Sequence, residues 1–199
     1  TIQKIMQENQ VERYFLVCGR NSYHALELDS ILAKIPVSYT HFSGFSSNPV
    51  YEEAVAGTEL FNSKPHGMIL AIGGGSAIDI AKCIRLFSAL NPKKNYLKQK
   101  YISVDIPLIV TPTTAGTGSE STHFAVLYEN GEKRSVCHKS MLPDAVVLEP
   151  GFLKSLNEYQ KKSAMLDALC QCIESYWSVN STEESKKYAH AGMRLILGN

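Results

Sequence analysis

The architecture of this chain follows from the segment Leu70-Ala71-Ile72-Gly73-Gly74-Gly75-Ser76-Ala77-Ile78-Asp79-Ile80-Ala81-Lys82. The apolar run 68–72 has strand character, and apolar residues return at helical spacing after three glycines and a serine. We therefore predict a strand, a tight turn and a helix. Glycine permits positive φ and close approach of a ligand, and the first N–H groups of a helix lack partners. The turn is a candidate anion site, unless its glycines serve only steric needs.

Strand-like and helix-like segments alternate through the first half of the chain. This alternation is typical of a parallel sheet built from βαβ crossovers, so we predict an open, mostly parallel α/β sheet. The expected strands are 14–18, 37–41, 68–72 and 107–110, and the expected helices are 3–12, 23–33 and 51–61.

The second half of the chain changes character. Asn130-Gly131 between two alternating runs predicts a β-hairpin, and a short strand is expected within 143–150. From Asn157 onward the pattern is helical. We therefore expect two domains, 1–152 and 153–199, and we interpret the second as the start of a longer helical domain because its last helical pattern has no stop signal.

Composition excludes several classes of function. The net charge of +1 gives no electrostatic footprint for nucleic acid or an anionic membrane, and no apolar run is long enough to span a bilayer. With no signal-peptide pattern at the N-terminus, we expect a cytoplasmic protein. The five cysteines lack paired CxxC spacing and are interpreted as small buried hydrophobes: Cys18, Cys83, Cys137, Cys170 and Cys172.

Four motifs together resemble the signature series of the iron-containing alcohol dehydrogenase family. They are Gly73–Ser76 with Asp79 and Lys82, then Thr111–Glu120, then Leu142-Pro143-Asp144, and finally 167–175. The resemblance implies a dehydroquinate synthase-like architecture, with a Rossmann-like nucleotide-binding sheet followed by the beginning of an all-helical metal and substrate domain. Members of the family are longer, so the chain resembles their N-terminal half.

The resemblance also implies roles for individual residues. The pyrophosphate of a nicotinamide nucleotide lies on Gly74, Gly75 and Ser76, and Lys133 reaches it from the hairpin. Lys133 is otherwise interpreted as a solvated strand-edge residue. Asp79 and Lys82 are interpreted as a surface ion pair without chemistry. The other implied cofactor-binding residues are Gly19, Arg20, Asn21, Ser22, Asn48, Thr113, Thr114 and Thr117.

The implied reaction is hydride transfer between NAD(P)H and a small aldehyde or alcohol, with a divalent iron or zinc ion polarising the carbonyl. Asp167 matches the first metal ligand, but Gln171 stands where the family has histidine. An amide oxygen suits such a metal poorly, so we expect metal binding to be weak or absent. Equally, Gln171 could satisfy buried polar groups.

Cofactor and substrate preferences follow from two further positions. The family carries an acid after the first strand, whereas here Gly19 is followed by Arg20, so we predict NADP(H) over NAD(H). The run 167–182 resembles the phosphonoacetaldehyde reductase branch. We expect a small-molecule substrate and a homodimer. The alternatives are a nucleotide-binding fragment without turnover, or an enzyme similar to glycerol dehydrogenase or dehydroquinate synthase.

Overall fold

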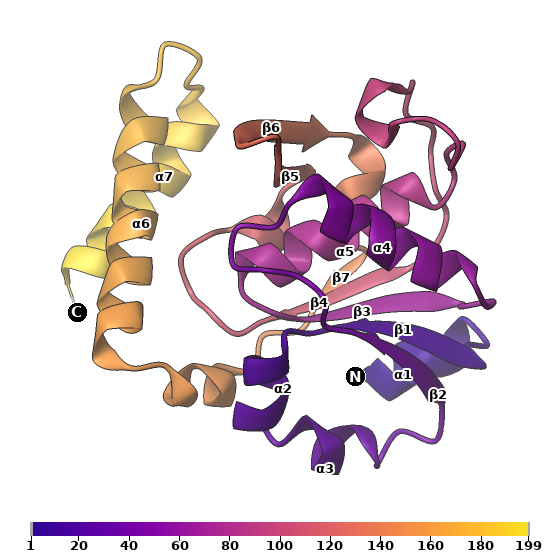
Figure 1. Cartoon of the computed structure of the whole chain (residues 1–199). Helices are drawn as coiled ribbons and strands as arrows, with labels where there is room; N and C mark the ends of the chain where they lie inside the picture. The colour runs from indigo at the N-terminus through magenta and orange to yellow at the C-terminus, as the bar shows by residue number, and fades with distance from the viewer. Residues whose placement is uncertain (1, 199) are drawn as a thin grey trace.

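A five-stranded parallel sheet forms the centre of the molecule (Figure 1). The computed structural model describes residues 2–198. The strand order is β2-β1-β3-β4-β7, and every neighbouring pair is parallel, as predicted. All six residues of β3 are buried because helices cover both faces of the sheet. The strands are β1 (Arg13–Val17), β2 (Ser38–Phe42), β3 (Met68–Gly73), β4 (Leu108–Pro112) and β7 (Ala145–Val146).

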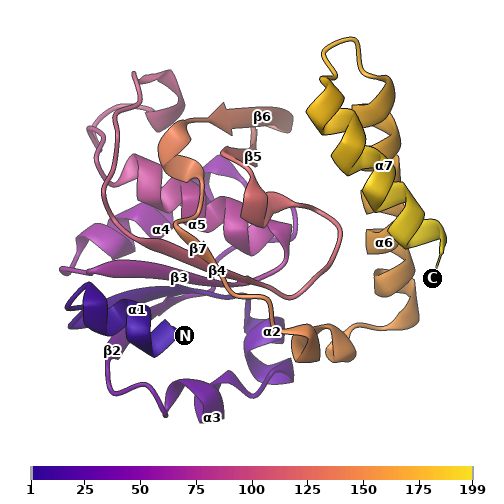
Figure 2. The ribbon, with the colours of Figure 1, turned by 180° about the vertical axis from the view of Figure 1, so that it is seen from behind.

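The helices of the first half lie in two layers, one on each face of the sheet (Figures 1 and 2). Alternate residues of β1 point to opposite faces, so Phe15 joins the apolar cluster under α4 and α5 while Leu16 joins the one under α1, α2 and α3. The helices are α1 (Ile2–Glu8), α2 (Arg20–Ala25), α3 (Leu28–Leu32), α4 (Tyr51–Asn62) and α5 (Gly75–Phe87).

The single helix expected at 23–33 is wrong, because two short helices occupy this region. Glu27 has a left-handed φ of 49° and separates α2 from α3. In one straight helix Leu28 would lie about 140° around the axis from Tyr23. The break allows both side chains to enter the same apolar cluster.

The predicted hairpin is present as β5 (Phe124–Glu129) and β6 (Glu132–Cys137), which pair antiparallel. Its turn residues Asn130 and Gly131 have φ values of 52° and 79°, the combination that tight hairpin turns need. Leu127 of β5 is buried in the cluster around α5, so the hairpin packs on the helix that follows the glycine turn.

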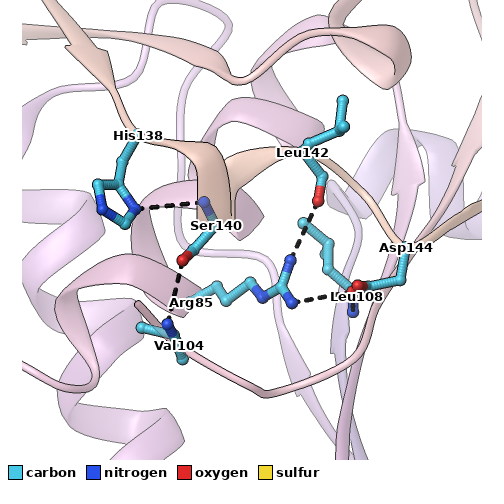
Figure 3. A network of polar contacts seen from close by, with 7 residues as sticks. All are labelled: Arg85, Val104, Leu108, His138, Ser140, Leu142 and Asp144. Atoms are coloured by element: carbon cyan, nitrogen blue, oxygen red, sulfur yellow. Dashed lines mark hydrogen bonds and ion pairs between the residues drawn. The ribbon is translucent and has the colours of Figure 1, made fainter. Parts of the chain in front are cut away.

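The Leu142–Asp144 motif fixes the C-terminal half of α5 to the sheet (Figure 3). The buried guanidinium of Arg85 lies 2.9 Å from the Asp144 carboxylate and donates a 3.1 Å hydrogen bond to the Leu142 carbonyl. The same Asp144 oxygen accepts a 2.8 Å bond from the Leu108 backbone N–H. This motif therefore has a structural role that joins α5, β4 and the start of β7.

Two antiparallel helices, α6 (Glu158–Trp177) and α7 (Glu183–Leu197), stand beside the sheet (Figure 2). They follow a 3₁₀ stretch, Pro150–Ser155, at the position where the sequence predicts a change of domain. No residue of α6 is buried, and Trp177 is 74% exposed. Among the described residues, no helix is both long and apolar enough to cross a membrane.

The interpretation of all five cysteines as buried is wrong in part. Cys18 and Cys83 are buried in the two apolar clusters, as expected. Cys137 and Cys170 are exposed, and Cys172 is partly exposed. The reason is local, since Cys137 ends the solvent-facing strand β6 and Cys170 lies on α6.

Candidate functional site

A cleft of about 860 Å³ opens at the carboxyl ends of the parallel strands, where open α/β sheets bind ligands. Segments that follow β1, β2, β3 and β4 form one side of it, and the first half of α6 forms the other. The predicted residues that line it are Gly19, Arg20, Asn21, Ser22, Gly74, Gly75, Ser76, Thr114, Thr117 and Asp167.

The glycine turn packs tightly against the loop after β4. A Cβ atom on Gly74 would lie 3.3 Å from the Thr114 side chain, and one on Gly75 would lie 3.1 Å from Thr117. In the described chain the glycines with positive φ are Gly118 and Gly131, so the turn does not use the left-handed conformation that glycine permits. Its glycines serve close approach instead.

The first turn of α5 presents backbone donors to the cleft. The Ala77 and Ile78 N–H groups both donate to the Gly74 carbonyl, whereas Gly75 and Ser76 line the cleft at the positive end of the helix. The Ser76 hydroxyl donates to the Ser47 carbonyl and thereby ties the turn to the loop after β2. This end of α5 therefore has the properties of an anion site.

One end of the cleft is cationic and rich in hydroxyl groups. Arg20 begins α2, and its Nε donates a 3.4 Å hydrogen bond to the Ser43 hydroxyl. Of the segment after β2, only Asn48 was predicted as a site residue, and the place of the residues before it in this cleft was missed. The parallel topology was the signal that could have found it, because all strands end at the same edge. The missed residues are Ser43, Phe45, Ser46 and Ser47.

A second cavity of about 510 Å³ continues from the glycine turn toward the hairpin. Asn48 and Lys133, two predicted cofactor contacts, both line it. Gly75, Ser76, Thr117 and Asp167 line both cavities, so the two are neighbours. Asp79, which was not predicted as a site residue, also lines this second cavity.

Two predicted site residues lie outside both cavities. Thr113 is only 5% exposed, and its backbone N–H donates a 3.0 Å bond to the Gly73 carbonyl. Gln171 donates a 2.9 Å hydrogen bond from its amide nitrogen to the Asp167 carboxylate. Thr113 thus supports the turn from below the surface, and Gln171 holds Asp167.

The donors around Asp167 do not fit an iron or zinc site. Within residues 2–198, no group of three or more His, Cys, Asp and Glu side chains is arranged to hold a metal ion. Gln171 points a hydrogen-bond donor at the carboxylate that would bind the ion. A neutral amide is also a poorer ligand for these metals than imidazole.

The interpretation of Asp79 and Lys82 as a surface ion pair is wrong. Lys82 is fully buried, and Asp79 is half-buried. Burial lowers the pKa of Lys82 and raises that of Asp79, while hydrogen bonds from Ser119 and Val126 act to lower the Asp79 pKa. Both side chains face the loop and hairpin that cover α5, rather than solvent.

Comparison with known proteins gives a consistent family. The family model described as iron-containing alcohol dehydrogenase matches residues 1–150. Aldehyde-alcohol dehydrogenase 2 of Entamoeba histolytica is 28% identical over 100% of this chain and 25% of its own length. The phosphonoacetaldehyde reductase of Streptomyces viridochromogenes is 35% identical over 63% of this chain and 35% of its own.

Solved structures agree in fold. The sulfoacetaldehyde reductase of Bifidobacterium kashiwanohense, determined in complex with NAD+, matches with a TM-score of 0.91 at 24% identity. The match covers 98% of this chain and 54% of that one. The chain therefore spans about half the length of this structural neighbour, and a smaller part of the two curated relatives.

Proposed function

Because the chain belongs to the iron-containing alcohol dehydrogenase family, we propose that it binds a nicotinamide dinucleotide and serves hydride transfer between that nucleotide and a small aldehyde or alcohol. The observation that carries the proposal is the cleft of about 860 Å³ in which the glycine turn and the N-terminus of α5 meet. An anionic pyrophosphate suits this place because backbone donors and the helix dipole both favour negative charge.

The two cavities suggest how the nucleotide lies. The pyrophosphate rests on Gly75 and Ser76, which line both cavities. The adenosine half extends toward Arg20, and the nicotinamide half extends toward Asn48 and Lys133 in the second cavity. The described donors around Asp167 do not fit an iron or zinc ion, because the Gln171 amide donates to the carboxylate that would bind it.

We propose a preference for NADP(H). Among the residues that line the first cavity, the one carboxylate is Asp167, which lies on α6, and the Arg20 end offers a guanidinium and hydroxyl groups. A 2′-phosphate would find a charge-assisted partner there and no repelling acid.

Titration of the chain with NADPH and NADH, followed by nicotinamide fluorescence, tests this preference. We expect tighter binding of NADPH, and we expect Arg20→Ala to weaken it about tenfold, as loss of one charge-assisted contact would. Arg13→Ala is the matched control, because Arg13 lies at the start of β1 and donates to Ser38 in a similar way. Equal or tighter binding of NADH would contradict the proposal.

We also propose an anionic small aldehyde as substrate. The supporting observation is that both a phosphonoacetaldehyde reductase and a sulfoacetaldehyde reductase match this chain. Oxidation of NADPH is measured with aldehydes that carry a phosphonate, a sulfonate or no charge. Turnover without preference for an anionic aldehyde would refute this assignment.

A nucleotide-binding module without turnover is the second candidate. It is favoured by Gln171, whose amide donates a hydrogen bond to the Asp167 carboxylate at the position where the family has a histidine ligand. Nucleotide binding without oxidation of NADPH by any aldehyde of the panel would support the module over the enzyme.

A further inference from the structure

We infer that Lys82, Ser119 and Asp79 form a positioning cluster that holds the loop after β4 in the shape needed to bind the nucleotide. The inference rests on the proposed function and goes beyond it, because the cluster contacts the loop and hairpin rather than acting as a phosphate ligand. Lys82 itself lines neither the first nor the second cavity.

The buried ammonium of Lys82 joins α5 to a short segment that is distant in sequence, residues 119–124. Its Nζ donates to the Ser119 hydroxyl at 3.1 Å, the Thr122 hydroxyl at 3.2 Å and the Phe124 carbonyl at 2.7 Å. These three acceptors use all three N–H groups of the ammonium. All three acceptors are neutral, and the nearby Asp79 carboxylate supplies the opposite charge that partly offsets the cost of burying the cation.

Ser119 connects this cation to the Asp79 carboxylate. Its hydroxyl accepts from Lys82 and donates a 2.5 Å hydrogen bond to Asp79 Oδ1, while Asp79 Oδ2 accepts from the Val126 N–H at 3.0 Å. The direction of the hydroxyl is thus fixed, since it lies between a donor and an anion. One residue of the loop is held from two positions on α5.

Ser119 also positions the side chain of Thr117, two residues before it. The backbone N–H of Ser119 donates to the Thr117 hydroxyl oxygen at 3.3 Å, so this hydroxyl is left to donate its own hydrogen elsewhere. Thr117 lies against Gly75 and lines both cavities. By holding Ser119, the cluster keeps its backbone N–H against the Thr117 hydroxyl oxygen, and the hydrogen of this hydroxyl remains available at the point where the pyrophosphate is proposed to rest.

Binding of NADPH to variants of the 199-residue chain tests the inference. Lys82→Met and Ser119→Ala should each raise the Kd about tenfold, since each releases a charge-assisted bond that shapes the loop. Because Lys82 acts through Thr117, Lys82→Met should change the Kd much less in a Thr117→Val background. Asp144→Asn is the control for stability, because it weakens the contact of Arg85 at the other end of α5.

Nucleotide affinity and thermal stability together distinguish a positioning role from a purely structural one. The inference holds if the cluster variants lose affinity while Asp144→Asn lowers the thermal midpoint and keeps the Kd. It is overturned if the Kd is unchanged in Lys82→Met and Ser119→Ala, or rises in all three variants in step with the loss of stability. If Lys82→Met does not fold, Ser119→Ala is compared in the unaltered and Thr117→Val backgrounds, because Ser119 also lines the second cavity. An effect of equal size in both backgrounds would then overturn the inference. If the unaltered chain binds no nicotinamide nucleotide, the proposed function fails, and this inference with it.

Discussion

Substitution of Gly116 by alanine should move α6 away from the cleft. A Cβ atom at this position would lie 2.3 Å from the Ala164 carbonyl oxygen and 2.9 Å from its carbonyl carbon. Both atoms belong to the backbone of α6, so no side-chain rotation relieves the clash. The Cβ to oxygen distance must widen by at least about 0.7 Å to reach 3.0 Å, below which real Cβ contacts are essentially never found.

The difference in burial between α6 and the loop that carries Gly116 indicates which of the two moves. None of the residues of α6 is buried, whereas the loop that carries Gly116 continues from the buried strand β4. We therefore expect α6 to shift and the sheet to stay folded, with a cost in unfolding free energy of about 1–3 kcal/mol or less. The shift removes Tyr159, Ala164 and Asp167 from one wall of the cleft.

Hydrogen exchange and nucleotide titration measure this effect. Amides of the first half of α6 should exchange faster in Gly116→Ala, and the Kd for NADPH should rise about tenfold, as the loss of roughly 1.4 kcal/mol of contacts would give. Gly67→Ala is the matched control, because its Cβ would meet Val11 at an ordinary 3.6 Å. Exchange and affinity equal to those of the unaltered chain would refute the contact between Gly116 and α6.

Three further outcomes can be measured. Asp144→Ala should lower the free energy of unfolding in urea by about 2 kcal/mol, less than a fully buried pair would cost because the Asp144 side chain is 50% exposed; no loss would contradict the role of Arg85. Burial lowers the pKa of His66 below 6.5, so the unfolded state binds more protons below that pH and stability should fall on acidification. This fall should flatten in His66→Asn. Elemental analysis should find no stoichiometric iron or zinc, even in Gln171→His, and one equivalent bound at Asp167 would show that our reasoning is wrong.

The sheet could be predicted because its signals are local and repeated. The run 68–72 is apolar throughout, as a strand buried on both faces must be, and Asn130-Gly131 encodes its own turn. The break at Glu27 could not be predicted, because glutamate does not favour a left-handed φ. Packing of Tyr23 and Leu28 in one cluster outweighs the local preference.

The residues of the candidate site that could be predicted are those whose position depends on the topology of the sheet alone. Residues that directly follow parallel strands meet at one edge, and this rule places Gly19 and Thr114 in one cleft. The rule does not reveal burial, so Lys82 was wrongly assigned to the surface because of its charge. The rule also does not say which side chains form hydrogen bonds with each other, so the bond between Gln171 and Asp167 could be found only from the structure.

The cleft is assembled from segments that are far apart along the chain. Such contacts close long loops, so the entropy of these loops must be lost before the binding surface exists. A nucleotide bound there adds a further link between segments that already touch at a few points, such as the bond from the Ser76 hydroxyl to the Ser47 carbonyl. At a concentration one hundred times its Kd it would add about 2.7 kcal/mol to the free energy of global unfolding, and exchange of the amides of the central strand would then report ligand occupancy. The segments are 19–22, 43–47, 73–77, 114–117 and 159–167.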